Sequence, residues 1–181
     1  MSIRLLSATM VAAGLTLGYA SMAHAQNAHS EWAVKAAYLY RFTQFVTWPS
    51  RSTDPGSIAV LDAPDIAEQL EHILPLHPTK NGPVRVRVIH SSEEIEDASI
   101  LYIGSKDRRR IESTLNALRG RPILVVTDCR EGLSLGAEIN FVTIDHRVRF
   151  EISTVAAERA NLYIGADLLG VASRVTQEAG E

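Results

Sequence analysis

The sequence is poor in cysteine, since Cys129 is the one thiol among its 181 residues. An intrachain disulfide is therefore excluded, and so is a zinc site built mainly from cysteine, which needs several thiolates. Free cysteine is among the most frequently buried residue types. Cys129 is accordingly predicted to be a buried and inert lone thiol, with pairing to another chain as the alternative.

Positive charge is also scarce. Lysine and arginine together number 18 against 21 aspartate and glutamate residues, which gives a formal net charge of −3. This balance argues against a nucleic-acid partner, because phosphates select a basic surface. It also argues against attraction to an anionic lipid surface, which requires a cluster of basic residues.

Sequence motifs for catalysis are missing. The chain has no glycine-rich phosphate loop, no G-x-S-x-G nucleophile elbow and no H-E-x-x-H zinc motif. His72 and His77 lie five residues apart across Pro75, whereas metal ligands on one helix face lie three or four apart. No residues assemble a nucleophile, a base and an oxyanion hole. We therefore predict a non-enzyme without catalytic residues, metal or cofactor.

The one long apolar run, residues 5–20, follows Arg4 and precedes the small-x-small triplet Ala23-His24-Ala25. This order is typical of a secretory signal peptide, and the run is shorter than the ~20 residues that span a bilayer. We expect export and cleavage near Ala25. Residues 1–25 would be the signal peptide and 26–181 a single domain without a membrane span; an uncleaved anchor is the alternative.

Aromatic rings gather in one stretch, VKAAYLYRFTQFVTWP, at residues 34–49. Apolar residues recur there at helical spacing, so we predict a helix from Glu31 to Trp48 that ends because of Pro49. Tyr40 and Trp48 lie off the apolar stripe and are predicted to dock a partner, although Trp48 suits a cap on the core equally well. The predicted core residues are Val34, Tyr38, Phe42, Phe45 and, from a later strand, Phe150.

Strands and helices are expected to alternate along the rest of the chain. The strands are predicted at 57–61, 84–88, 99–104 and 122–128. The helices are predicted at 64–74, at 105–120 from an N-cap at Ser105, at about 154–160 and at about 165–174. A hairpin is predicted with its turn at Asp145-His146. This order predicts an α/β fold, a three-layer sandwich whose mostly parallel sheet ends in an antiparallel C-terminal hairpin.

The second arm of that hairpin alternates apolar and charged residues, so Arg147, Arg149 and Glu151 share one face. Lys35 lies on the apolar side of the first helix, and we expect it to pair with a carboxylate such as Glu151 or Asp167. The predicted partner-binding residues are Tyr40, Trp48, Pro49, Arg147, Arg149 and Glu151.

Three blocks of sequence together resemble the YfiR family, which is also called HmsC-like. They are VKAAYLYRFTQFVTWP, ILVVTDCREGLSLGAEINFV and RVRFEISTVAAERANLYIGADLLGVAS, within residues 31–175. The resemblance implies a periplasmic repressor that binds the periplasmic part of an inner-membrane diguanylate cyclase, or another inner-membrane sensor, and restrains cyclic-di-GMP synthesis and biofilm formation. It also implies a homodimer and an outer-membrane peptidoglycan-binding lipoprotein that can remove the repressor.

The chain departs from the family pattern at two places. Some members carry two cysteine pairs, whereas this chain has Cys129 alone, and Ser153 stands where the family leads us to expect asparagine. Two other functions stay open. One is a periplasmic small-ligand sensor acting on another membrane receptor, with its crevice near Gly104-Ser105 and Asp128 at the carboxyl ends of the strands. The other is an uncharacterised enzyme, argued from the fold alone.

Overall fold

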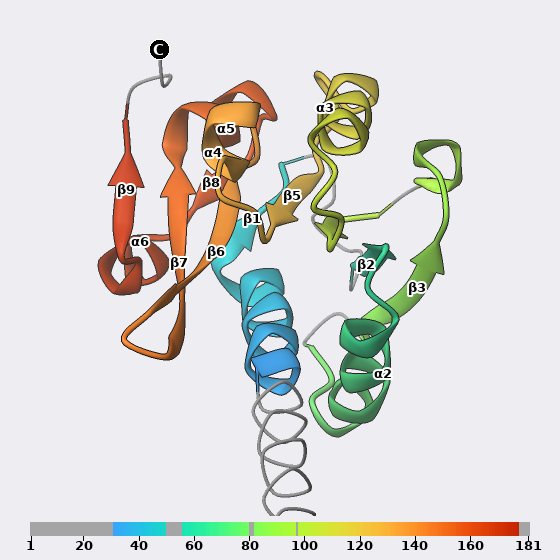
Figure 1. Ribbon diagram of the computed structural model, residues 1–181. Helices are drawn as coiled ribbons and strands as arrows, with labels where there is room; N and C mark the ends of the chain where they lie inside the picture. The colour runs from blue at the N-terminus through green and yellow to red at the C-terminus, as the bar shows by residue number, and fades with distance from the viewer. Residues whose placement is uncertain (1–30, 50–55, 80–81, 97, 178–181) are drawn as a thin grey trace, which may run out of the picture.

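The computed structural model describes residues 31–49, 56–79, 82–96 and 98–177. Its centre is a seven-stranded sheet with the strand order β3-β2-β4-β5-β6-β7-β9, and β1 pairs separately with β8 (Figure 1). The strands are β1 (Val46–Thr47), β2 (Ser57–Leu61), β3 (Arg85–Ile89), β4 (Ile100–Ile103), β5 (Leu124–Thr127), β6 (Ile139–Ile144), β7 (Arg147–Ser153), β8 (Tyr163–Ile164) and β9 (Arg174–Thr176).

Helices cover this sheet. They are an N-terminal helix described over 31–45, α2 (Pro64–Ile73), α3 (Arg108–Ala117), α4 (Gly132–Leu135), α5 (Thr154–Arg159) and α6 (Ala166–Val171), with 3-10 turns at Leu74–Leu76 and Ser92–Glu94. No helix in these residues is long and apolar enough to cross a membrane. The predicted signal peptide, residues 1–25, lies outside the described residues.

The central strands are buried on both faces, as their unbroken apolar runs predict. On β2, Ile58 and Val60 join a core cluster with the N-terminal helix and α2, whereas Ala59 and Leu61 join a second cluster with α3. In Figure 1, α3 lies on one side of the central strands, with α2 and the N-terminal helix on the other. The fold is therefore the predicted three-layer α/β sandwich with a mostly parallel sheet.

The C-terminal part of the sheet contains the predicted antiparallel hairpin. β6 and β7 pair antiparallel, with Phe141 opposite Phe150 and Ile144 opposite Arg147. Asp145 and His146 have φ angles of 49° and 58°, which makes a two-residue turn of the type that matches the twist of a hairpin. β9 then adds a parallel strand beside β7, which the sequence pattern does not indicate.

Several helix boundaries differ from prediction, among them the end of the last helix, α6, which stops at Val171 before β9; two of the differences have a clear local cause. The N-terminal helix ends at residue 45, before Pro49, because Val46 and Thr47 pair with β8 and the Gly165 N–H donates to the Phe45 carbonyl at 2.8 Å. Val46 and Thr47 are β-branched and suit this pairing. Helix α3 is capped by Asp107, whose side chain accepts from the Arg109 N–H at 2.9 Å, and not by Ser105.

The apolar stripe of the N-terminal helix is rotated from its predicted position. Its buried residues are Ala36, Leu39, Phe42 and, just past its end, Val46, while Val34 is 39% exposed. The prediction that Val34 belongs to the core is therefore wrong. Phe42 and Phe150 are fully buried, and Tyr38 and Phe45 are half-buried against the same cluster.

Candidate protein-interaction surface

A groove of about 520 Å³ lies between the N-terminal helix and the β6–β7 hairpin. We call it the hairpin groove. Its position follows from the rotated helix stripe, because the side of the helix that turns from the core faces the exposed end of the hairpin. The residues that line it are Glu31, Val34, Tyr38, Thr143, His146, Arg147, Val148 and Arg149.

The charge of the hairpin groove is positive. The negative charge of Glu31 is balanced by Lys35 on the next helical turn, whose ammonium donates a hydrogen bond to the Glu31 carboxylate. Within the part of the chain that the structure describes, neither Arg147 nor Arg149 has a carboxylate at ion-pair distance. Two guanidinium groups are therefore available to an acidic partner, and Arg is well suited to bidentate binding of carboxylates.

A cluster of stacked rings supports the groove from below. Tyr38 lines the groove and its ring centroid lies 5.2 Å from that of Phe150 in an edge-to-face contact. Phe42 lies beneath, 5.3 Å from Phe150 and 6.0 Å from Phe141. Aromatic pairs at these spacings stabilise one another beyond simple burial. The rings of the N-terminal helix are thus mainly core, and Tyr38 connects that core to the surface.

A buried lysine fixes the helix to the sheet. Lys35 is 4% exposed, and its ammonium donates to the Asp128 carboxylate at 2.8 Å as well as to Glu31. Burial alone would lower the pKa of Lys35, but the hydrogen bonds and negative charges of Asp128 and Glu31 outweigh it, so the pKa is raised. Burial, and after it the negative charge of Asp128, raises the pKa of Tyr102.

Lys35 does form the kind of ion pair that its place on the apolar face predicted, but with other partners. The expected partners were Glu151 or Asp167, whereas the observed ones are Asp128 and Glu31. Glu151 instead binds Arg174 on β9 through two hydrogen bonds of 2.9 and 2.8 Å. The Lys35–Asp128 contact joins positions 93 residues apart, and no local pattern reveals such a pair.

The turn after β5 holds Asp128 in place. Thr127 donates to the Asn140 side-chain oxygen at 2.9 Å, and the Cys129 N–H donates to the same oxygen at 3.2 Å. Gly132 packs so closely here that a Cβ would lie 2.1 Å from the Thr127 hydroxyl. These residues belong to the middle resemblance block, and their role in this structure is to shape one turn.

Cys129 differs from its prediction, because its side chain is half-buried and not fully enclosed. It packs against the cluster under α3. Ser153, where asparagine was expected, caps α5 by accepting from the Ala156 N–H at 3.2 Å. Serine and asparagine are comparable N-caps, so this departure keeps the local structure.

The predicted partner-binding residues do not form one surface. Arg147 and Arg149 share the hairpin groove, whereas Glu151 is engaged by Arg174. Tyr40 is half-buried with its ring 5.5 Å from that of His77. Trp48 is half-buried and donates its indole N–H to the Ser99 carbonyl at 3.1 Å, as a cap on the core would. Pro49 is exposed at the edge of the described segment.

Sequence reasoning missed Val34 and His146 as groove residues. Val34 shares the helical spacing of the larger rings, and this spacing alone predicts a core position for it. His146 was seen only as half of a turn, although a two-residue turn at the tip of a hairpin always exposes its side chains. Within the described residues, no three His, Cys, Asp or Glu side chains gather as they would at a metal site.

The ligand crevice expected near Gly104-Ser105 and Asp128 is packed. A Cβ on Gly104 would lie 2.6 Å from that of Ala63. Lys106 as well as Lys35 binds the Asp128 carboxylate, at 3.0 Å. At this expected crevice the Asp128 carboxylate is therefore already bound by two lysines of the protein itself.

Comparison with solved structures shows likeness in the fold. A domain from Streptococcus pneumonia, described as the ABC domain in complex with L-Trp, superposes with a TM-score of 0.50 and 11% identity over 76% of this chain and 60% of that one. A conserved domain protein from Vibrio cholerae O1 biovar eltor superposes with a TM-score of 0.45 and 15% identity over 70% of this chain and 57% of that one. The chain thus spans about 60% of the length of the first structure.

No curated protein matches the chain. The model of the family described as YfiR/HmsC-like matches residues 32–173, which include the N-terminal helix, the turn after β5 and the hairpin. Proteins of this family are periplasmic regulators of cyclic-di-GMP signalling rather than enzymes, and they act on membrane signalling proteins. The chain therefore belongs to the YfiR/HmsC-like family.

Proposed function

We propose that the protein binds the periplasmic part of an inner-membrane diguanylate cyclase and holds the enzyme inactive, so that cyclic-di-GMP synthesis and biofilm formation are restrained. Family membership supports the regulatory role. We choose the hairpin groove as the contact surface because Arg147 and Arg149, which line it, are without carboxylate partners among the described residues. The contacting segment of the cyclase is therefore acidic, with apolar residues that reach Val34 and Tyr38.

Other features of the groove support a protein partner. Val34 is 39% exposed and Ile144 is 45% exposed, which leaves large apolar side chains at the surface beside the arginines. Interfaces commonly combine apolar and aromatic anchors with arginine in this way. The homodimer and the peptidoglycan-binding lipoprotein belong to the same proposal, with the lipoprotein competing for the repressor.

The experiment replaces Arg147 and Arg149 by glutamate in the full chain. A strain lacking the gene is complemented with wild type, with the R147E/R149E variant or with the control R85E/R109E, whose two arginines are exposed and lie outside the groove. Cyclic-di-GMP content and co-purified membrane proteins are measured. We expect deletion to raise cyclic-di-GMP, wild type and control to restore it, and R147E/R149E to lose both repression and the membrane partner.

The outcomes separate the parts of the proposal. Unchanged cyclic-di-GMP on deletion, with no membrane protein captured, would refute the regulatory role. Full repression by R147E/R149E would retain the role but exclude the hairpin groove as the contact. Because the contact is electrostatic, capture of the partner should also weaken with added salt.

A further inference from the structure

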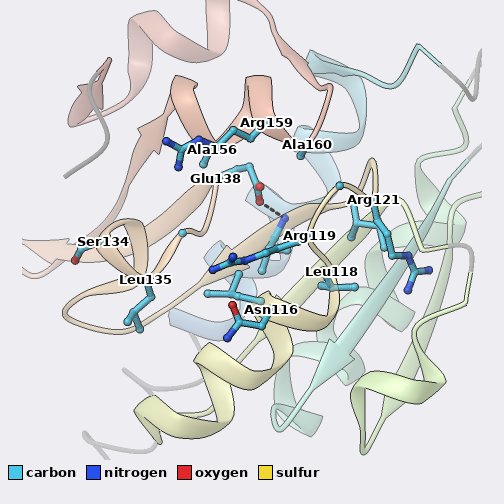
Figure 2. Close-up of a pocket in the computed structure, with 15 residues that line it drawn as sticks. Asn116, Leu118, Arg119, Arg121, Ser134, Leu135, Glu138, Ala156, Arg159 and Ala160 are labelled. Atoms are coloured by element: carbon cyan, nitrogen blue, oxygen red, sulfur yellow. Dashed lines mark hydrogen bonds between the residues drawn. The ribbon is translucent and has the colours of Figure 1, made fainter. Parts of the chain in front are cut away.

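A second cavity, of about 550 Å³, lies beside the core cluster that α3 covers. It is enclosed by the loop between α3 and β5, the end of α4, and α5 (Figure 2). Its volume is in the range of ~300–1,000 Å³ found for small-molecule sites. Leu118, Ile123 and Val125 give it apolar walls.

Glu138 forms the floor of this cavity. Its carboxylate oxygen Oε2 accepts from the Val125 N–H at 2.7 Å, a contact drawn in Figure 2. The ladder between β5 and β6 begins only at Val126 and Ile139, so the side chain replaces a missing backbone acceptor. Glu138 is 5% exposed, and burial raises its pKa to about 8. At neutral pH the group is thus mostly protonated and adds little negative charge to the cavity.

The rest of the charge around the cavity is positive. Arg119, in the loop after α3, and Arg159, the last residue of α5, stand on different walls (Figure 2). Among the described residues neither has a carboxylate at ion-pair distance. Arg121 is held by the carbonyls of Ile95 and Glu96, at 2.8 and 2.5 Å, and its charge is also not neutralised by a carboxylate.

We propose that this cavity binds a small organic anion, whose apolar body packs against Leu118 and Ile123 and whose carboxylate is bound by Arg119 and Arg159. Small-molecule sites in general combine apolar walls with a few polar groups, as this cavity does. Arg119 and Arg159 are exposed, and a neutral or cationic ligand gains no charge-assisted hydrogen bond from them, so the site prefers an anion. The walls come from three separate elements, and the ligand ties the α3–β5 loop to α5.

A series of matched probes tests the charge preference. Purified full-length protein is titrated by calorimetry with 2-naphthoate, with neutral 2-naphthamide and with the cation 2-naphthylmethylammonium, which share one ring system. We expect the anion to bind and the other two to bind at least about tenfold more weakly, because a charge-assisted contact contributes a factor of that size. The assay uses no membrane partner, so its result is independent of the proposed regulatory role.

Variants locate the site. Replacing Arg119 or Arg159 by alanine should weaken binding of 2-naphthoate about tenfold each. Arg109→Ala is the control, because Arg109 is exposed on α3 and does not line the cavity. Methyl signals of Leu118 and Leu135 should shift on titration. Three results would each overturn the proposal. They are equal affinity for all three probes, wild-type affinity of R119A and R159A for 2-naphthoate, and no binding of 2-naphthoate up to its solubility limit.

Discussion

Replacing Glu138 by glutamine should remove a large part of the pH dependence of folding stability. Burial raises the pKa of Glu138 to about 8, against a smaller lowering by the hydrogen bond from the Val125 N–H. In the unfolded chain the carboxyl titrates near 4.5. Between these two values, the folded protein holds a proton that the unfolded chain has lost.

The sign and size follow from this difference in bound protons. The contribution of the group to stability is fully present below about pH 4.5, declines through the window and is lost above about pH 8. Inside the window the free energy of unfolding falls by about 1.4 kcal/mol per pH unit, so the wild type loses roughly 3 kcal/mol between pH 5 and pH 7 from this group alone.

The assay is urea unfolding at several pH values between 5 and 8, for wild type, Glu138→Gln and the control Glu68→Gln. Glutamine keeps a carbonyl oxygen that can accept from the Val125 N–H, but it does not titrate. Glu68 is exposed on α2, so its substitution should leave the wild-type slope unchanged. We expect the stability of Glu138→Gln to rise relative to wild type by roughly 3 kcal/mol from pH 5 to pH 7. Parallel pH profiles of wild type and Glu138→Gln would refute the reasoning, because the folded carboxyl would then be ionised throughout.

Three further experiments test the packing of the N-terminal helix and of the turn after β5 that pairs with it. Phe42→Ala should cost about 3–5 kcal/mol in urea unfolding, because the ring is fully buried, whereas Val34→Ala should cost under about 1 kcal/mol; equal costs would place the core stripe elsewhere. A double-mutant cycle of Lys35→Met and Asp128→Asn should give a coupling energy of about 1–2 kcal/mol, because Lys35 is buried and the Asp128 side chain is 24% exposed. Additive effects of the two substitutions would show that the ion pair does not contribute to stability. Gly132→Ala should lower the melting temperature by an amount equivalent to about 1–3 kcal/mol, because its Cβ overlaps the Thr127 hydroxyl, and a neutral effect would mean that the turn can yield.

The sheet was predictable because its signals are local. The predicted bounds of strand β2 agree with the observed ones. The runs around Ile100–Ile103 and Leu124–Thr127 are apolar at nearly every position, as expected for a strand that helices cover on both faces. The two-residue strand β1 carries no such signal. Val46 and Thr47 leave the helix because β8, more than a hundred residues later, offers a ladder.

The candidate surface was only partly predictable for a related reason. Alternation along β7 predicts that Arg147 and Arg149 share one face, and in the structure both line the hairpin groove. The opposite wall depends on how far the N-terminal helix is rotated, and that rotation places Phe42 against Phe141 and Phe150 of the hairpin. A sequence pattern gives the period of a stripe but not its angle to a distant sheet.

The buried Lys35 explains why the groove has a defined shape at all. Apolar packing under the helix is non-directional, so it resists sliding or rotation of the helix only weakly. An ammonium that is 4% exposed cannot move away from Asp128 without leaving a buried charge unpaired, which costs several kcal/mol. Asp128 is in turn fixed to the end of β5 by the turn that Thr127, Asn140 and Gly132 form. The buried Lys35–Asp128 pair therefore helps to fix the position of the helix that carries Val34, one wall of the hairpin groove.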